Sequence, residues 1–406
     1  MNEKIVSSDI EQFKKQLENP DEQVSDSERI FDTPFDTKSN IQKVTKNVIL
    51  SISSDYGGCG HIRNFLIMNV INAVFGKKRK LHAIITPFFT NQTDILARTR
   101  TIFFQRTMTP RLIPTVRKYR EVKDKLKYKM VYDIDDFIYD GEDVDECIPE
   151  YNFGRHKIDD SVRKANIECM NLMDTVCVST EFLGNYIKKK LKIEPEIAIV
   201  PNTVPQYFWG NQYRHNIKEK IEKPRIVYTG SPTHYCNRTK QLGDWNNAWK
   251  DYIIKNVKED KIEFTCMGGL PWFFEEIKDK IRIIEWLHTY KYHLPLLDIR
   301  PHFSIGPLVP NYFNYSKSDI KAIEAYACGS IFIGSVFSNG KPSPYDNCFV
   351  TIKDSECTVD NIEKLISDCS EPEKFNSIID SQFNYMIDDG RYTESPKFIN
   401  NLLKII

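Results

Sequence analysis

Four aspartates follow a short apolar run in the stretch KMVYDIDDFIYD, and their spacing could support chemistry. They are Asp133, Asp135, Asp136 and Asp140. Carboxylates this close together can bind a divalent metal, act as general bases, or end a strand and face water. The first reading predicts a metal-dependent enzyme centred on the DIDD motif, such as a nuclease or a phosphoryl-transfer enzyme.

A glycine-rich loop, SSDYGGCGHIRN, lies between an apolar run and a helical pattern. Its residues Gly58 and Gly60 let the backbone approach a ligand closely, and a helix that begins there favours an anion. His61 and Arg63 follow directly. The loop matches neither a dinucleotide-binding fingerprint nor a P-loop, so by itself it is also typical of a tight turn.

The second half of the chain repeats this arrangement in YTGSPTHY. Gly230 and Ser231 follow a predicted strand, and Arg238 and Lys240 lie shortly downstream, where they could meet phosphates or simply face water. Two strand–glycine loops, one in each half, indicate a bound anionic ligand more strongly than either loop alone.

The stretch YSKSDIKAIEAYACGS predicts a helix with a charged face. Lys317, Lys321 and Glu324 are spaced at i, i+4 and i+7, which places them on the same side of the helix. Such a face is usually solvated. Its position after the predicted strand FSIGPLVP favours a functional interpretation, because loops and helices at the carboxyl ends of parallel strands hold ligands.

Short apolar strands alternate with helical patterns from Asn47 onward, and a second such series begins at Arg225. This alternation predicts an α/β protein with two doubly wound, Rossmann-like domains that face each other across a cleft. We expect a polar extension over 1–45, an acceptor-side domain over 46–205, a donor domain over 206–390, and a helix over 391–406 that packs back.

Composition narrows the class of protein. The 406 residues are 41% hydrophobic with 56 basic and 56 acidic side chains, and no apolar run is long enough to cross a bilayer. Ten scattered cysteines without metal-ligand spacing favour a reducing cytoplasm. The charge is uneven: residues 63–130 carry 16 Lys and Arg against 3 Asp and Glu, and 131–150 carry 9 acids and no Lys or Arg. Either solvated helix faces or a basic face for a polyanion would account for this pattern.

An ordered set of motifs spans about residues 46–390: GGCGHIR, FFQR, YDIDDF, VCVSTEFL, IVPNTV, YTGSPTH, LDIRPHFSIGPL and KSDIKAIEAYACG. The set resembles the GT-B glycosyltransferases of the large retaining group called family 4, especially a bacterial and phage branch. The resemblance implies that Glu324 binds the ribose of a nucleotide-sugar donor, and that the Gly230–Ser231 loop, the backbone near Gly329 and Lys317 or Lys321 hold the diphosphate. The glutamate that the family usually carries eight residues before Glu324 is Ser316 here.

The D-x-D spacing resembles the metal-binding motif of glycosyltransferases of the other common fold, but it lies in the first half, away from the donor motifs. We therefore expect Asp135 and Asp136 to act from the acceptor side, with His61, and expect no metal and no cofactor beyond the co-substrate. The donor-binding residues that we expect are Gly58, Gly60, Arg63, Gly230, Ser231, Arg238, Lys240, Lys317, Lys321 and Glu324.

The expected function is transfer of a sugar from a nucleotide-diphosphate sugar, with uridine as the base, to an acceptor hydroxyl with retention. A hydroxymethylated pyrimidine in phage DNA would explain the basic 63–130 region, and the site of action would then be the host cytoplasm. Three alternatives stay open at this point: a glycan, lipid or protein acceptor, the metal-dependent enzyme centred on DIDD, and a non-catalytic nucleotide-sugar-binding protein.

Overall fold

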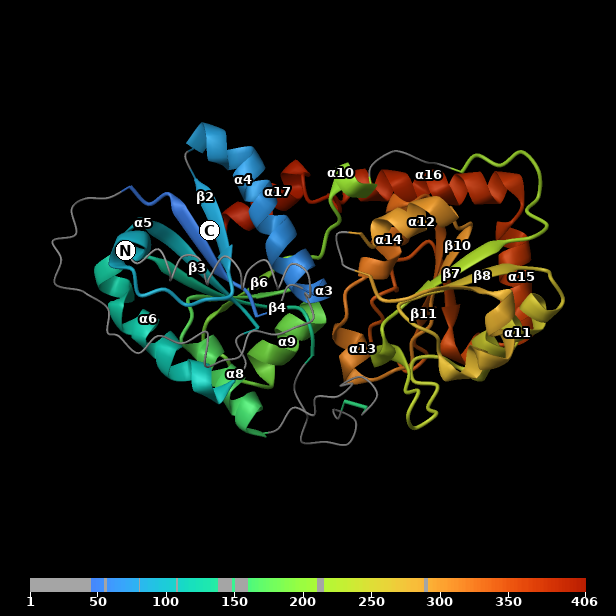
Figure 1. Cartoon of the computed structure of the whole chain (residues 1–406), viewed down its shortest axis with the longest axis horizontal. Coiled ribbons are helices and arrows are strands. Elements are labelled where there is room, and N and C mark those ends of the chain that lie inside the picture. Colours follow the sequence, from blue (N-terminus) through green and yellow to red (C-terminus); the bar gives the residue numbers. More distant parts are fainter. Residues whose placement is uncertain are drawn as a thin grey trace. The chain divides into compact units, whose positions relative to one another are not determined.

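The computed structural model describes residues 45–54, 57–79, 81–106, 109–137, 148–149, 160–209, 215–287 and 291–406. The expected N-terminal extension, except for residue 45, and Asp140 lie outside the described residues. The chain divides into two compact units (Figure 1). Unit 1 holds the described residues of 1–135, 159–201 and 399–406, and unit 2 holds those of 136–158 and 202–398.

Unit 1 is built on a parallel sheet of six strands in the order β2-β1-β3-β4-β5-β6. Its central strands are almost entirely buried, as expected where helices cover both faces of a parallel sheet. The strands are β1 (Val48–Ile52), β2 (His82–Thr86), β3 (Thr99–Gln105), β4 (Lys129–Ile134), β5 (Thr175–Val178) and β6 (Glu196–Ile199).

Local capping interactions explain two of the helix ends in unit 1. The Thr180 hydroxyl accepts a hydrogen bond from the backbone of Leu183 and caps α9, and Lys127 ends α6 in the left-handed region at φ 55°. The helices are α3 (Gly58–Gly60), a π-helical turn (His61–Phe65), α4 (Leu66–Arg79), α5 (Thr93–Arg98), α6 (Ile113–Leu126), α8 (Asp160–Asn171) and α9 (Glu181–Lys189).

Unit 2 is a second parallel sheet of six strands, in the order β12-β11-β10-β7-β8-β9. The strands are β7 (Arg225–Thr229), β8 (Glu263–Met267), β9 (Arg282–Ile284), β10 (Phe303–Gly306), β11 (Ile331–Val336) and β12 (Val350–Lys353). An aromatic-rich core that includes Trp245, Trp249 and Phe274 packs against this sheet. In both units the strand order reverses beside β1 or β7, which is where doubly wound sheets bind ligands.

The sequence pattern predicts a helix over residues 240–254 after β7, but the helix begins later than this expectation. Lys240 has a left-handed backbone (φ 56°), and the Asn246 side chain caps the Trp249 amide, so α11 starts at Asn247 rather than Lys240. The helices of unit 2 are α10 (Gln206–Trp209), α11 (Asn247–Lys258), α12 (His293–Ile299), α13 (Tyr312–Ser316), α14 (Ile320–Ala327), α15 (Val359–Cys369) and α16 (Pro372–Asp388). The chain then returns to unit 1 through α17 (Pro396–Leu403).

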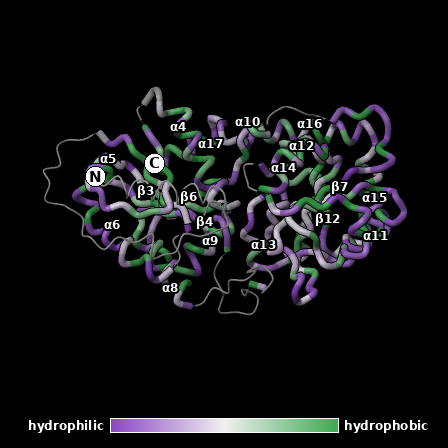
Figure 2. The backbone as a smooth tube through the Cα atoms, in the orientation of Figure 1, coloured by the Kyte–Doolittle hydropathy of each residue, from purple (hydrophilic) through white to green (hydrophobic). Residues whose placement is uncertain are grey.

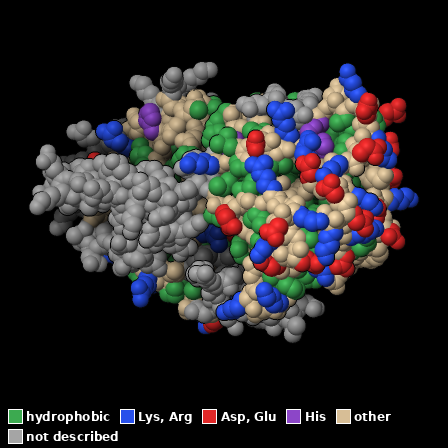
Figure 3. Space-filling view, turned by 45° about the vertical axis from the view of Figure 1, so that its right-hand side comes forward, with side chains coloured by type: hydrophobic (Ala, Val, Ile, Leu, Met, Phe, Trp, Pro, Cys, Tyr) green, Lys and Arg blue, Asp and Glu red, His purple; other side chains and the backbone are tan. Residues whose placement is uncertain are grey.

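Hydropathy follows this architecture. In Figure 2 the hydrophobic residues run along the sheets, and hydrophilic residues cover outer helices such as α11 and α15. Figure 3 shows acidic and basic side chains interspersed on the face of unit 2 that is turned toward the viewer. Within unit 2, ion pairs such as Lys255 with Glu363 and Lys220 with Glu371 join basic and acidic side chains. No helix among the described residues has the length and apolar character that a membrane span requires.

Candidate functional site

The loop after β7 begins at a residue, Gly230, that has no room for a side chain. The Gly230 amide donates to the Met267 carbonyl at 3.0 Å. A Cβ atom on Gly230 would lie 2.2 Å from the hydroxyl of Tyr228. Gly268 is left-handed at φ +99°, and a Cβ atom there would lie 2.6 Å from the Gly230 carbonyl oxygen. The glycine of the YTGSPTH motif therefore has a steric cause inside unit 2.

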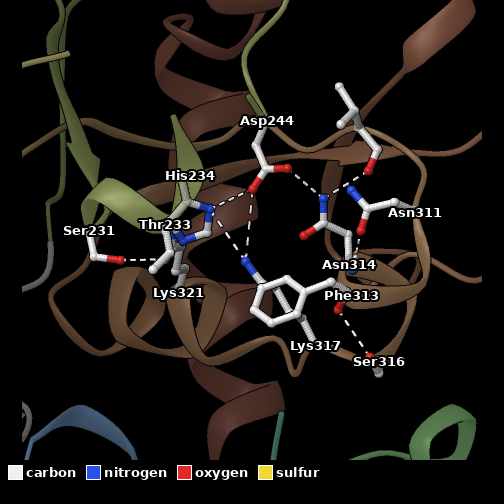
Figure 4. Close-up of polar contacts among 11 residues, drawn as sticks. Ser231, Thr233, His234, Asp244, Asn311, Phe313, Asn314, Ser316, Lys317 and Lys321 are labelled. Atoms are coloured by element: carbon white, nitrogen blue, oxygen red, sulfur yellow. Dashed lines mark hydrogen bonds and ion pairs between the residues drawn. The ribbon is translucent and has the colours of Figure 1, made fainter. Parts of the chain in front are cut away.

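Directly after this loop, His234 forms a buried pair with Asp244. The His234 Nδ1 atom lies 2.6 Å from Asp244 Oδ2, and the other oxygen, Oδ1, accepts from Asn314 Nδ2 at 2.5 Å (Figure 4). Asn314 also donates to the Val309 carbonyl at 2.8 Å. Burial alone would raise the pKa of Asp244, but hydrogen bonds from His234 and Asn314 and the charge of Lys317 lower it. Asp244 is therefore a buried, ionised carboxylate.

Two lysines of the predicted charged face meet this pair from the other side. Lys321 Nζ lies 3.2 Å from His234 Nε2, and Lys317 Nζ lies 3.9 Å from Asp244 Oδ2 (Figure 4). The two ammonium groups also face aromatic rings, Lys321 at 5.2 Å from the Tyr228 centroid and Lys317 at 4.6 Å from that of Phe313. Unit 2 thus gathers two cations beside one buried carboxylate.

Desolvation brings the pKa of Lys321 close to neutrality. Burial, and then the charge of Lys317, lower the pKa of Lys321 to about 7, although Asp244 and Glu324 oppose the shift. Burial and the charges of both lysines also lower the pKa of His234 to about 3, so its imidazole is neutral. An anion that entered this site would favour the charged form of Lys321.

Glu324 lies one turn beyond Lys321 on α14 and is held by a tyrosine that the sequence did not reveal. The Tyr292 hydroxyl donates to Glu324 Oε2 at 3.1 Å. Burial raises the pKa of Glu324 to about 7, and Tyr292 and Lys321 oppose that shift. A carboxylate with one oxygen held in this way can accept hydrogen bonds from hydroxyl groups through its remaining lone pairs.

Other expected donor-binding residues lie elsewhere on this loop. The Ser231 and Thr233 hydroxyls bond to each other at 2.6 Å. Arg238 and Lys240 occupy the exposed turn between the bridged residues Cys236 and Gln241, and Lys240 Nζ lies 5.5 Å from the Trp272 ring centroid. None of these contacts joins Arg238 or Lys240 to Lys317 or Lys321.

Ser316, which takes the position where the resembled glycosyltransferases usually carry a glutamate, bonds to the backbone of its own helix. Ser316 is fully buried, and its hydroxyl donates to the Tyr312 carbonyl at 2.8 Å. It also donates to the Phe313 carbonyl at 3.0 Å (Figure 4). At the far end of α14, Gly329 is left-handed at φ 74° and its amide donates to the Tyr326 carbonyl at 3.1 Å. Lys317, which directly follows α13, and Lys321 and Glu324 on α14 supply the charged groups of the predicted helix face.

In unit 1, Arg63 makes a bidentate ion pair with Asp133. Its Nε lies 3.1 Å from Oδ2 and its Nη2 lies 2.6 Å from Oδ1, while Nη1 donates to the Val200 carbonyl. The two side chains are 1% and 7% exposed. Burial would lower the pKa of Arg63, but the charge and hydrogen bonds of Asp133 raise it. In this structure Arg63 joins its helix to β4 and β6, and Asp133 of the DIDD motif has its charge neutralised.

The remaining residues expected to be catalytic or donor-binding lie near the carboxyl ends of β1 and β4. His61 is buried in the π-helical turn and stacks on Phe65 at 5.3 Å. Gly60 is buried, whereas a Cβ atom on Gly58 would meet nothing within 4 Å. Asp135 offers a carboxylate oxygen within 4.8 Å of the Cys59 sulfur, and Asp136 follows it in the chain.

Several basic side chains of helix α6 form ion pairs with acidic residues of unit 1. Arg117 Nε donates to Glu168 at 2.6 Å, Arg120 pairs with Asp174 at 3.0 Å, and Lys123 also contacts Asp174. Such exposed pairs stabilise a protein by only about 0–1 kcal/mol, but they reduce the field that a polyanion would meet.

Sequence reasoning missed four residues of the unit 2 site: His234, Asp244, Asn314 and Tyr292. His234 belonged to the YTGSPTH motif, but nothing in the sequence joined it to an aspartate ten residues later. Asn314 and Tyr292 come from α13 and from the segment before α12, which meet the site only through the tertiary fold.

No protein-family model matches the sequence, and no curated protein matches it. Solved structures match the fold. Sucrose-phosphate synthase from Thermosynechococcus elongatus is 11% identical with a TM-score of 0.52, over 89% of this chain and 100% of that one. Anabaena Alr3699/HepE in complex with UDP is 7% identical with a TM-score of 0.53, over 89% and 100%. OtsA is 9% identical with a TM-score of 0.51, over 89% and 99%. These likenesses confirm the predicted α/β class and the GT-B fold with two Rossmann-like domains.

Proposed function

We propose that this chain is a glycosyltransferase that moves a sugar from a nucleoside-diphosphate sugar, with UDP as the carrier, to an acceptor hydroxyl. One observation carries the proposal. In unit 2 of a GT-B fold, Lys317 and Lys321 contact His234, which follows the glycine loop of β7, and Glu324 lies one turn beyond Lys321. This set joins cations for a diphosphate with a carboxylate for ribose hydroxyls. The structure of HepE, which shares the fold, contains UDP, and this supports the choice of carrier.

The chemistry of such a transfer agrees with this charge distribution. As the bond between the sugar and the diphosphate breaks, negative charge grows on the leaving phosphate, and Lys317 and Lys321 would stabilise it. Lys321 lies in a desolvated environment, where an ammonium–phosphate contact is stronger than in water. Transfer with retention, in which the acceptor hydroxyl attacks on the leaving-group face and its proton passes to the departing phosphate, demands no strong base from the protein.

Glu324→Ala is expected to weaken UDP binding by about 10- to 100-fold, because it removes an acceptor for charge-assisted hydrogen bonds worth about 1.5–3 kcal/mol. Isothermal titration calorimetry with UDP measures this. Glu363→Ala, which removes a half-exposed glutamate on α15 of the same unit, is the matched control and should leave binding unchanged. Absence of UDP binding by the wild-type protein would contradict the proposed function. The metal-dependent alternative instead predicts a tightly bound Mg or Mn and loss of activity in EDTA, which metal analysis of the purified protein and an activity assay with chelator would test.

We further propose retention and a hydroxymethylated pyrimidine in phage DNA as the acceptor, with action in the host cytoplasm. The support is the excess of basic residues over 63–130, which includes the exposed side chains of Arg100, Arg111 and Lys125 in unit 1. A glycan, lipid or protein acceptor is the competing possibility, and an anionic membrane would attract the same basic side chains.

The double substitution Arg111→Glu/Lys125→Glu is expected to weaken binding of hydroxymethylated duplex DNA about tenfold or more at ~50 mM salt, because phosphate contacts dominate such binding. Electrophoretic shift measures it, with liposome sedimentation in parallel and Lys364→Glu, an exposed lysine of α15 in unit 2, as the control. If wild-type protein binds liposomes and not DNA, the DNA acceptor is wrong. If it binds neither, the basic region has no role with polyanions.

A further inference from the structure

The partners of His234 allow only one placement of its ring proton. Asp244 is ionised and can only accept, so Nδ1 must carry the hydrogen that bridges the 2.6 Å contact. Nε2 is then an acceptor, and it faces Lys321 Nζ at 3.2 Å. Both contacts agree with a neutral imidazole protonated on Nδ1.

This tautomer separates the two lysines. Lys317 Nζ lies 3.4 Å from Nδ1, but two donors cannot bond to each other, so Lys317 is attracted by the Asp244 charge at 3.9 Å instead. Lys321 alone gains a directional bond from the imidazole. Nδ1 of His234 therefore faces the buried carboxylate of Asp244, and Nε2 faces the ammonium group of Lys321 (Figure 4).

The buried anion is itself held from outside this pair. Asn314 donates to Asp244 Oδ1 and to the Val309 carbonyl, and Asn311 caps the Asn314 amide at 2.9 Å. Asp244 is therefore anchored to α13, and it cannot rotate away from His234 without breaking contacts made by a fully buried asparagine. The orientation of the imidazole follows from this anchorage.

We infer that His234 and Asp244 act as a positioning pair: Asp244 fixes the ring of His234, and His234 Nε2 aims the Lys321 ammonium at the diphosphate of the donor. The inference rests on the proposed function, because it assigns a partner to a lysine of the proposed donor site. Neither His234 nor Asp244 touches the ligand in this scheme. Their effect reaches the ligand only through Lys321.

Two substitutions of one residue separate positioning from simple packing. In His234→Gln the side-chain oxygen can take the place of Nε2 and accept from Lys321, whereas in His234→Asn the shorter amide can reach Asp244 but not Lys321. We expect His234→Asn to weaken binding of UDP and of inorganic pyrophosphate about tenfold or more, and His234→Gln to stay within about threefold of wild type, because one charge-assisted hydrogen bond is lost or kept. Uridine, which has no phosphate, should bind all three proteins equally.

Calorimetry with UDP, pyrophosphate and uridine, together with ¹⁵N NMR of the His234 ring in the unliganded protein, tests the inference. The expected result is a hydrogen on Nδ1, none on Nε2, and a difference between the two variants that is confined to the phosphate-bearing ligands. A hydrogen on Nε2, equal losses in His234→Asn and His234→Gln, or an equal loss of uridine binding would overturn the positioning role while UDP still bound the wild type. If the wild type bound neither UDP nor pyrophosphate, the proposed function would fail, and the positioning role with it.

Discussion

Replacing Arg63 by methionine is expected to lower the free energy of unfolding by about 3–5 kcal/mol, because it leaves the carboxylate of Asp133 buried without its counter-ion. Asp133 is 7% exposed and receives two hydrogen bonds from the guanidinium, so water cannot replace them. The Val200 carbonyl loses its donor as well. Urea denaturation followed by circular dichroism measures the change.

The double substitution Arg63→Met/Asp133→Leu is the informative control. It removes both charges together and fills the space with apolar groups, so it should recover most of the loss. Lys255→Met removes one member of an exposed pair, 44% and 43% accessible, and should change the free energy of unfolding by about 0–1 kcal/mol. If Arg63→Met were as mild as Lys255→Met, Asp133 would be solvated or neutral, and the ion pair would not stabilise unit 1.

Lys321→Met is expected to weaken UDP binding about 10- to 100-fold at pH 7 and to remove the alkaline limb of its pH dependence. In the wild type, burial and Lys317 hold the pKa of Lys321 at about 7, and a bound diphosphate would raise that pKa. Above pH 7 the unliganded lysine loses its proton and binding must restore it. Wild-type affinity should therefore fall about tenfold between pH 7 and 8.5.

Four other ionisable groups, His234, Asp244, Lys317 and Glu324, act on Lys321, and the experiment separates their effects from that of the lysine itself. His234, with a pKa of about 3, and Asp244, whose pKa is lowered, do not titrate in this range, and Lys317 adds a positive charge. The pKa of Glu324 is about 7, so its ionisation above that pH would strengthen ribose contacts and partly offset the loss. Lys321→Met keeps this opposing limb. Calorimetry from pH 7 to 9 measures the UDP affinity of the wild type, of Lys321→Met and of the control Lys364→Met. The assignment would be contradicted if the affinity of Lys321→Met changed with pH as steeply as that of the control.

The fold was largely predictable because short stretches of sequence determine where its strands form. Runs such as NVILSIS and KMVYDID are apolar and bounded by turns, and the strands β1 and β4 formed within them. The start of α11 was not predictable from periodicity, since its position depends on one capping side chain, Asn246, and on the left-handed backbone of Lys240. Periodicity alone does not mark such a break, although Asn246 is of a type preferred at helix N-caps.

The candidate site was predictable only where its residues share an element. Lys317, Lys321 and Glu324 follow helical spacing and meet in the structure through α14 and the turn before it. Arg63 appeared as a cation near a glycine loop, and no pattern in the sequence showed that Asp133, seventy residues away, would bury and neutralise it. His234 and Asp244 are only ten residues apart, but they lie in a loop without helical or strand spacing, so no periodicity in the sequence showed that they would pair.

Residues 399–406 complete unit 1 although they follow the whole of unit 2. Leu402, Ile405 and Ile406 are buried there, and the Ile406 carbonyl accepts a hydrogen bond from the Thr101 hydroxyl at 3.1 Å. During synthesis on the ribosome at about 5–20 residues per second, the intervening segment, 202–398, takes roughly 10–40 s to emerge. The N-terminal unit must wait that long with part of its core uncovered. The order of translation therefore favours unit 2 as the first part of the protein to reach its final packing, and makes unit 1 the half that needs protection from aggregation.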